Sequence, residues 1–276
     1  MAISAKEVNK LRQMTGAGMM DCKKALVEAD GDFDKAIELL RKKGQKVSAS
    51  RADRDTTEGI VVARTNDNNT EGIVVAFTCE TDFVAKNDDF VSMGNKIADI
   101  AFQEKPASIE ELKAYKTGEL TLDEEITELV GKIGEKLDIT AYKTLSGEAI
   151  VPYIHAGSKL GVLVSLKNVG DADTASAGKD VAMQIAAMNP VALDKDGVDA
   201  SIVEKEIEIG KEQARQEGKP EAMLEKIALG KLNKFYKENT LLSQEFVKDN
   251  SKTISQYLDG LNKGMTVSAF ERVSIG

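Results

Sequence analysis

The segment from Cys79 to Phe90 carries the side chains whose types and spacing could do chemistry. It reads Cys-Glu-Thr-Asp-Phe-Val-Ala-Lys-Asn-Asp-Asp-Phe, follows an apolar run that predicts a strand, and precedes a helical pattern from about Asp89 to Phe102. The order predicts that Thr81, Asp82 and Phe83 lie at a strand-to-helix corner, where side chains can project from a rigid scaffold. Locally, two interpretations stay open. Either Thr81 or Asp82 caps the helix while Phe83 fills the core, or the corner contacts another molecule.

The residue types present exclude several classes of enzyme. One histidine, His155, and two distant cysteines, Cys22 and Cys79, cannot supply the usual zinc cluster. The chain has no Gly-x-x-x-x-Gly-Lys-Ser/Thr loop, no Gly-x-Ser-x-Gly elbow and no Gly-x-Gly-x-x-Gly turn. An acid–base enzyme would rest only on abundant carboxylates, which cannot be paired without geometry. We therefore expect no catalytic residue, no metal and no cofactor.

Composition and charge indicate an ordinary soluble protein. The 276 residues are 42% apolar and 30% charged, with a net charge of −9, and can form two or three domains. The acidic balance argues against direct nucleic-acid binding, and no apolar run approaches the roughly 20 residues that span a bilayer. The N-terminus lacks a signal-peptide pattern, and the distant cysteines favour free thiols. We expect a cytoplasmic protein without a membrane partner.

The N-terminal 45 residues predict a small three-helix module. The first helix begins with a capping box at Ser4 and Glu7, and the third ends at Gly44. Residues 46–56 then predict a flexible basic linker rather than a nucleic-acid-binding patch, because no aromatic residues are interleaved with the charges. Met19 and Met20, at the start of the second helix, suit either core packing or an adaptable contact surface.

The remaining residues predict sheets and a helical hairpin. Glu-Gly-Ile-Val-Val-Ala occurs at 58–63 and again at 71–76, around an Asn/Asp loop, which predicts a β-hairpin. Helices at about 201–217 and 221–238 predict an antiparallel helical hairpin, used for internal packing or as an interface with a second subunit. Further helices are expected at 109–115, 122–137 and 180–188, and further strands at 139–145, 149–155, 160–167 and 267–275.

Five strings, in this order, resemble the bacterial elongation factor Ts family, and the similarity covers essentially the whole chain. The strings are Met14–Leu26, Thr81–Lys86, Tyr153–Val164, Met183–Pro190, and Gly218–Pro220 followed by Gly230–Tyr236. The resemblance implies an α+β fold with a ubiquitin-associated-like three-helix module and two α+β core subdomains. The implied division is module 1–45, linker 46–56, first subdomain 57–145, second subdomain 146–200 with 239–276, and hairpin insertion 201–238.

The family also implies a function in translation elongation. Its members are not enzymes but guanine-nucleotide exchange factors that bind the GTPase elongation factor Tu, in its GDP-bound and nucleotide-free forms. The implied contacts are a magnesium-displacing segment (Thr81, Asp82, Phe83 and Val84), a docking surface on the N-terminal module (Leu11, Arg12, Met19, Met20, Asp21 and Lys23), a polar contact near the phosphate loop (His155), and a grip on a second GTPase domain (Phe235–Phe246). Gln184 stands where some relatives have histidine, and we assign it no role.

Two further interpretations stay open from the residues alone. A lone histidine in an apolar strand, such as His155, is often a structural residue rather than a contact. The chain could also be a non-catalytic adaptor whose three-helix module binds a partner peptide. In either case the helical hairpin is compatible with a monomer or with a homodimer.

Overall fold

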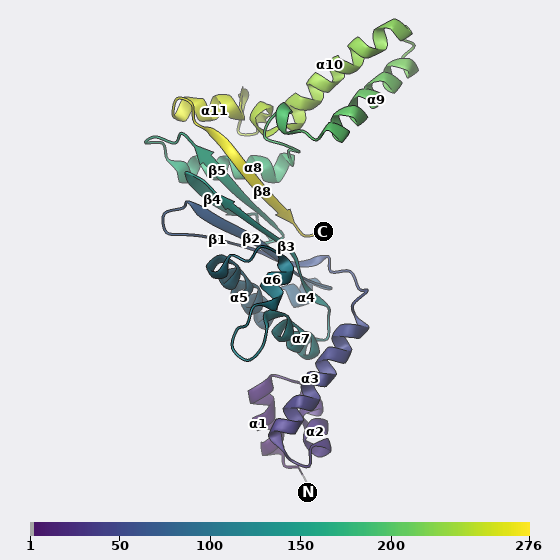
Figure 1. Ribbon diagram of the computed structural model, residues 1–276, viewed down its shortest axis with the longest axis vertical. Coiled ribbons are helices and arrows are strands. Elements are labelled where there is room, and N and C mark those ends of the chain that lie inside the picture. The colour runs from purple at the N-terminus through teal and green to yellow at the C-terminus, as the bar shows by residue number, and fades with distance from the viewer. Residues whose placement is uncertain (1–2) are drawn as a thin grey trace.

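The computed structural model describes residues 3–276 as an elongated molecule with its sheets in the middle (Figure 1). A three-helix module lies at one end and a projecting helical hairpin at the other. Helices and strands are mixed along the chain, as predicted for an α+β protein. No helix among these residues is long and apolar enough to cross a bilayer.

The N-terminal module consists of α1 (Ala5–Thr15), α2 (Met19–Glu28) and α3 (Phe33–Ser50). The predicted capping box is present: the Glu7 amide donates to the Ser4 hydroxyl, and the Ser4 amide donates to the Glu7 carboxylate. Gly16, at φ +66°, ends α1 in the left-handed region that favours glycine. The module is held by a small core of its own, which contains Leu11, Cys22, Ala25, Leu26 and Ala36.

The third helix corrects the prediction that it ends at Gly44, because α3 continues to Ser50. The first residues of the expected linker, 46–50, are therefore helical. Gly44 is buried within α3, and its backbone lies against Gly131 of α7 (Leu122–Ile133). Here the glycine permits a close helix–helix approach rather than terminating the helix.

Two three-stranded antiparallel sheets form the centre of the molecule. The first has the order β1 (Glu58–Thr65), β2 (Glu71–Cys79), β3 (Leu137–Ser146), and the second has the order β4 (Ala149–Ile154), β5 (Leu160–Lys167), β8 (Thr266–Ser274). The repeated hexapeptides form the predicted hairpin, with Glu58 opposite Cys79. The strand expected at 139–145 is β3, and it pairs with β2 rather than with the strand that follows it in the chain.

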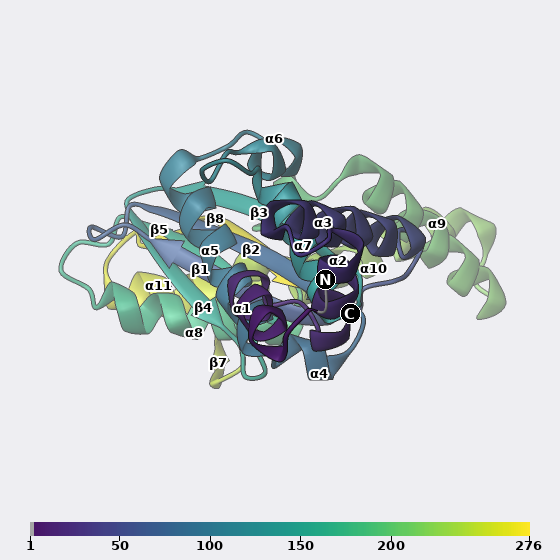
Figure 2. The same cartoon turned by 90° about the horizontal axis from the view of Figure 1, so that it is seen from below.

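The two sheets pack face to face and are covered by helices on their outer faces (Figures 1 and 2). Alternation along β2 explains this arrangement. Its odd-numbered residues, such as Phe77, face a core under the helices α5 (Asp88–Glu104), α6 (Ile109–Ala114) and α7. Its even-numbered residues, such as Val74, meet Ile150 and Leu163 of the second sheet. The outer face of the second sheet is covered by α8 (Thr174–Met188) and α11 (Ile254–Leu261).

The helical hairpin has the predicted antiparallel form and projects away from the sheets (Figure 1). It consists of α9 (Ala200–Gln216) and α10 (Glu221–Asn239), which approach closely where Gly210 faces Ala228. Short 3₁₀ turns (Lys195–Gly197 and Leu241–Ser243) and the two-stranded ribbon β6 (Glu245–Phe246) and β7 (Asp249–Thr253) connect it to the second sheet. The ribbon and α11 were not predicted. Helix α8 was predicted to start at 180, but it begins six residues earlier, at Thr174, where Asp173 caps it.

Candidate functional site

The corner after β2 is a short, well-anchored turn. Thr81 caps α4 (Asp82–Ala85), because its hydroxyl accepts a hydrogen bond from the Val84 amide at 3.4 Å. The same hydroxyl and the Thr81 amide donate to the two carboxylate oxygens of Glu135, at 2.7 Å and 3.0 Å. Thr81 therefore caps the single turn α4 and not the longer helix for which the cap was predicted. The longer helix α5 is capped by Asn87.

Phe83 does not fill the core, which corrects the local interpretation of this residue. Its side chain is 83% exposed, the most exposed large apolar side chain among the described residues. The aromatic packing beneath the corner is supplied by Phe77 and Phe90, whose stacked rings lie 4.5 Å apart and are completely buried. The capped turn therefore holds the Phe83 ring in solvent, away from the core.

Asp82 and Lys86 flank Phe83 on the same turn. The Lys86 ammonium donates to the Asp82 carboxylate at 2.8 Å, and both side chains are exposed. This hydrogen bond and the positive charge of Lys86 hold the pKa of Asp82 below its ordinary value. Because exposed ion pairs contribute little to stability, the Asp82 carboxylate can exchange this partner for another cation at small cost.

Val84, the fourth residue predicted for this segment, packs inward against the core of the first sheet. Its side chain is partly buried and helps to anchor α4. The anchoring continues on the other side of the corner, where Glu80 accepts hydrogen bonds from Arg51 and from the Lys136 amide, each at 2.7 Å. Burial raises the pKa of Glu80, but these two hydrogen bonds, together with the positive charges of Arg51 and Arg54, outweigh it and leave the pKa below its ordinary value. Glu80 and Glu135 were not predicted, since nothing local in the sequence marks an anchor 54 residues away.

His155 lies in the turn between β4 and β5, at the same end of the sheets as the corner. The β4–β5 turn contacts β1, where the Val61 amide donates to the Ser158 carbonyl at 2.6 Å. Lys159 pairs with Glu58, the residue opposite Cys79 at the end of β2. His155 is exposed and follows the strand instead of lying within it, and its Nδ1 is 2.9 Å from the Tyr153 hydroxyl. The structure therefore favours a surface role for His155 over a buried structural one.

The N-terminal module presents a second apolar surface. Met19 and Met20 are 56% and 62% exposed at the start of α2, so they are not core residues. Met14 and Val27 of the same module are each 57% exposed, and they were not predicted as contact residues. Arg12 of α1 and Lys23 of α2 are exposed as well.

Two of the residues predicted for the module surface are already engaged within this protein. Leu11 is completely buried in the core of the module, so it supports α1 instead of contacting a partner. Asp21 is half-buried and pairs with Lys43 of α3 at 2.5 Å.

The residues predicted to grip a second GTPase domain are similarly divided. Phe246 is buried and stacks on Tyr257 with ring centroids 4.3 Å apart, and Phe235 is partly buried. Val247, one residue beyond the predicted range, is 51% exposed. Gln184 is completely buried; its amide nitrogen donates to Gln244 and to the Glu245 carbonyl, and its oxygen accepts from the Val247 amide. Gln184 therefore holds the β6–β7 ribbon in place.

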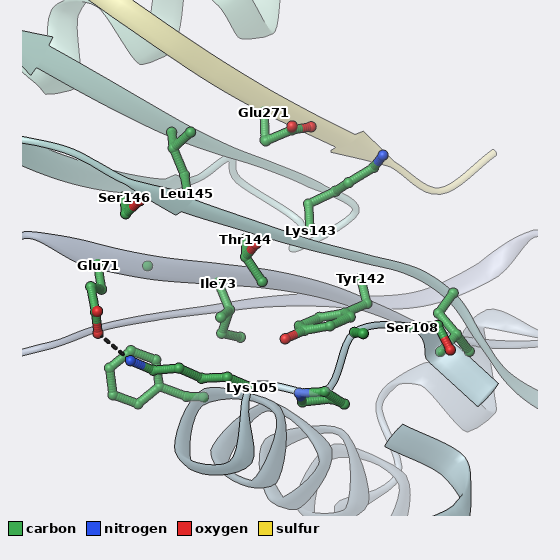
Figure 3. A pocket seen from close by; sticks show the side chains of 15 residues that line it. Glu71, Ile73, Lys105, Ser108, Tyr142, Lys143, Thr144, Leu145, Ser146 and Glu271 are labelled. Carbon is green, nitrogen blue, oxygen red and sulfur yellow. Dashed lines mark hydrogen bonds and ion pairs between the residues drawn. The ribbon is translucent and has the colours of Figure 1, made fainter. Parts of the chain in front are cut away.

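A cavity of about 700 Å³ lies far from the corner (Figure 3). It is lined by Glu71, at the opposite end of β2, and by Lys105, which forms an ion pair with Glu71 at 2.5 Å. Residues 3–276 contain no cluster of three or more histidine, cysteine, aspartate or glutamate side chains placed to hold a metal ion. The arrangement as a whole resembles a surface for binding another protein, with apolar residues projecting from anchored turns.

Comparison with known proteins agrees with this geometry. The family model described as "Elongation factor TS" matches residues 80–276. The elongation factor Ts of Cytophaga hutchinsonii is 63% identical over 274 residues, covering 99% of each chain, and that of Amoebophilus asiaticus is 59% identical over 276 residues, covering 100% of each. The elongation factor Ts of Christiangramia forsetii is 54% identical over 275 residues, covering 99% of each chain. The chain therefore belongs to the elongation factor Ts family.

Proposed function

We propose that this protein is the guanine-nucleotide exchange factor of the GTPase elongation factor Tu, and that it acts by protein–protein binding. The observation that carries the mechanism is the exposure of Phe83 on a turn whose backbone is fixed at Thr81. The Phe83 ring inserts between elements of the GTPase beside its nucleotide site. Asp82, on the same turn, displaces the magnesium ion that neutralises the phosphates of GDP.

Exchange requires a difference in affinity rather than a bond-making step. If the factor binds the nucleotide-free GTPase more tightly than the loaded form, linkage lowers the affinity for GDP by the same factor. Burying a phenylalanine supplies about 1.5–3 kcal/mol, and each tenfold change in affinity takes about 1.4 kcal/mol. Burial of Phe83 alone therefore accounts for a roughly 10- to 100-fold decrease in the affinity for GDP. Removal of magnesium lowers this affinity further.

The remaining contacts hold the two proteins together. Met19 and Met20, with Arg12 and Lys23, dock the N-terminal module on the nucleotide-binding domain of the GTPase, and His155 makes a polar contact near its phosphates. The segment Phe235–Phe246, with the exposed Val247 in the β6–β7 turn that follows it, grips a second GTPase domain. A homodimer formed through the helical hairpin stays a prediction, supported only by the exposed Ile209, Met223 and Leu229.

The test is the release of labelled GDP from elongation factor Tu. We expect the full chain to accelerate release. The Phe83→Ala/Asp82→Asn variant should accelerate it at least tenfold less, because roughly 1.5–3 kcal/mol of phenylalanine burial is lost. Leu261→Ala, which truncates a 45% exposed apolar side chain on α11, is the matched control and is expected to behave as the unchanged chain. Release at the full rate by the double variant would refute the mechanism. Tight binding without any acceleration would instead support an adaptor.

Stability measurements separate a lost contact from a damaged fold. Because Phe83 is exposed, Phe83→Ala is expected to leave the free energy of unfolding within about 0.5 kcal/mol. Phe90→Ala, which empties a completely buried position, is expected to cost about 3–5 kcal/mol. Urea unfolding of both variants provides this comparison.

A further inference from the structure

The N-terminal module is joined to the rest of the protein by direct backbone contact between two helices. A Cβ atom on Gly131 of α7 would lie 2.7 Å from the Cα atom of Gly44 in α3. A Cβ atom on Gly44 would lie 3.3 Å from the Thr127 carbonyl oxygen. No side chain separates the helices at this point, so their crossing has almost no freedom to adjust. Glycine weakens a helix relative to alanine. Two glycines facing one another at one crossing therefore indicate that the short distance between the α3 and α7 backbones offsets this loss of helix stability.

Polar contacts accompany the crossing on both sides of Gly131. Arg41 of α3 pairs with Glu128 of α7 at 2.7 Å. Lys132, one residue after Gly131, lies over Gly16 in the loop between α1 and α2 and pairs with Asp89 of α5 at 2.7 Å. The module is therefore attached through its loop as well as through α3.

The far end of α3 leads directly to the corner that carries Phe83. Arg51, immediately after α3, donates to Glu80 at 2.7 Å, and Glu80 precedes Thr81. The Lys136 ammonium donates to the carbonyl oxygens of Ala52 and Arg54 at 2.7 Å and 2.9 Å, while its amide holds Glu80. Lys43 of α3, next to Gly44, pairs with Asp21, which follows Met20, so α3 links the side of the module that carries Met20 with the corner.

We propose that Gly44 and Gly131 are positioning residues that hold the Met19–Met20 surface at a fixed separation from Phe83, so that both surfaces bind one GTPase molecule together. This inference rests on the proposed exchange function. Once the first surface has bound, the second faces its target at an effective concentration set by the link between them, and a rigid link of the correct length gives the highest value. A pre-oriented pair of surfaces also loses less conformational entropy on binding than two surfaces on a flexible tether.

The test measures GDP release from elongation factor Tu as a function of the concentration of the full-length chain. Gly131→Leu forces α3 and α7 apart, and we expect the concentration for half-maximal release to rise at least about tenfold, as expected when part of the gain from a rigid link is lost. The rate at saturation should stay unchanged, because the corner itself is intact. Gly230→Leu on α10 is the matched control, since a Cβ at that position meets no atom within 4 Å.

A double-mutant cycle with Met20→Ala separates positioning from general loosening of the fold. Met20→Ala should raise the half-maximal concentration in the unchanged chain but have little further effect in the Gly131→Leu chain. Gly131→Ala provides a milder perturbation in case the leucine variant does not fold, with circular dichroism and urea unfolding as the check.

The possible outcomes are distinguishable. Half-maximal concentrations equal to that of the unchanged chain for the folded Gly131 variants, or an undiminished Met20→Ala effect in them, would overturn this inference while the exchange function stands. Failure of the unchanged chain to accelerate release would refute the exchange function, and this inference with it.

Discussion

Replacing Thr81 with valine removes one hydroxyl group and keeps the shape of the side chain. The lost bond to Glu135 is short, at 2.7 Å, and has a charged acceptor, whereas the lost capping bond to Val84 is long, at 3.4 Å. A hydrogen bond to a charged group contributes about 1.5–3 kcal/mol, and this one belongs at the lower end because Glu135 keeps the Thr81 amide as a donor. A weak cap adds about 0.5 kcal/mol. We expect Thr81→Val to lower the free energy of unfolding by about 2 kcal/mol.

The same change should reduce exchange, because a frayed α4 no longer holds Phe83 in one orientation. We expect about a tenfold loss of GDP-release activity, equivalent to about 1.4 kcal/mol of lost pre-orientation. Thr81→Ser keeps the hydroxyl and is the matched control. Urea unfolding and the release assay are run on both variants in parallel. If the valine and serine variants agree in stability and in exchange rate, the hydroxyl does not hold the corner and the reasoning fails.

Two further predictions concern the strands that lead to the corner. Gly59→Ala should destabilise the fold by more than about 2 kcal/mol, because a Cβ at φ +146° would lie 2.2 Å from the Phe77 carbonyl oxygen; an unchanged urea midpoint would contradict this. Burial, and secondarily the charge of Glu135, raise the pKa of the Cys79 thiol to about 12, whereas an unfolded cysteine ionises near pH ~8.5. Its contribution to stability is thus complete below about pH 8.5 and is lost as the pH rises towards about 12. In a Cys22→Ser background, Ellman's reagent at pH 8 should label Cys79 only after unfolding. Rapid labelling of the folded chain would show that the Cys79 thiol is neither buried nor held protonated.

The elements with strong local patterns were predicted well. The repeated hexapeptides at 58–63 and 71–76 form β1 and β2, and the two amphipathic stretches around Gly218 form the helical hairpin. These predictions succeed because strand alternation, helical periodicity and turn residues act within a few positions of one another. The short elements β6, β7 and α11 were missed, since eight residues or fewer carry too little periodicity to be distinguished from a loop.

Glycine and phenylalanine show where local reasoning fails. Gly44 was expected to end a helix, yet α3 continues because Gly131 of another helix lies against it. Phe83 fits a core position by pattern alone, but the core is already filled by Phe77 and Phe90. In both cases the outcome depends on a partner that is distant in the sequence.

The sequence by itself determined the family, the main helices and strands, and the residues at the corner, because each is recorded in residue types and short spacings. Only the tertiary structure decided which of those residues are free to contact a partner. Exposure separates Phe83, Met19 and Met20 from the buried Leu11 and the inward-facing Val84. It also showed that the corner is anchored from distant segments, since burial and long-range hydrogen bonds are properties of packed elements and leave no local pattern in the chain.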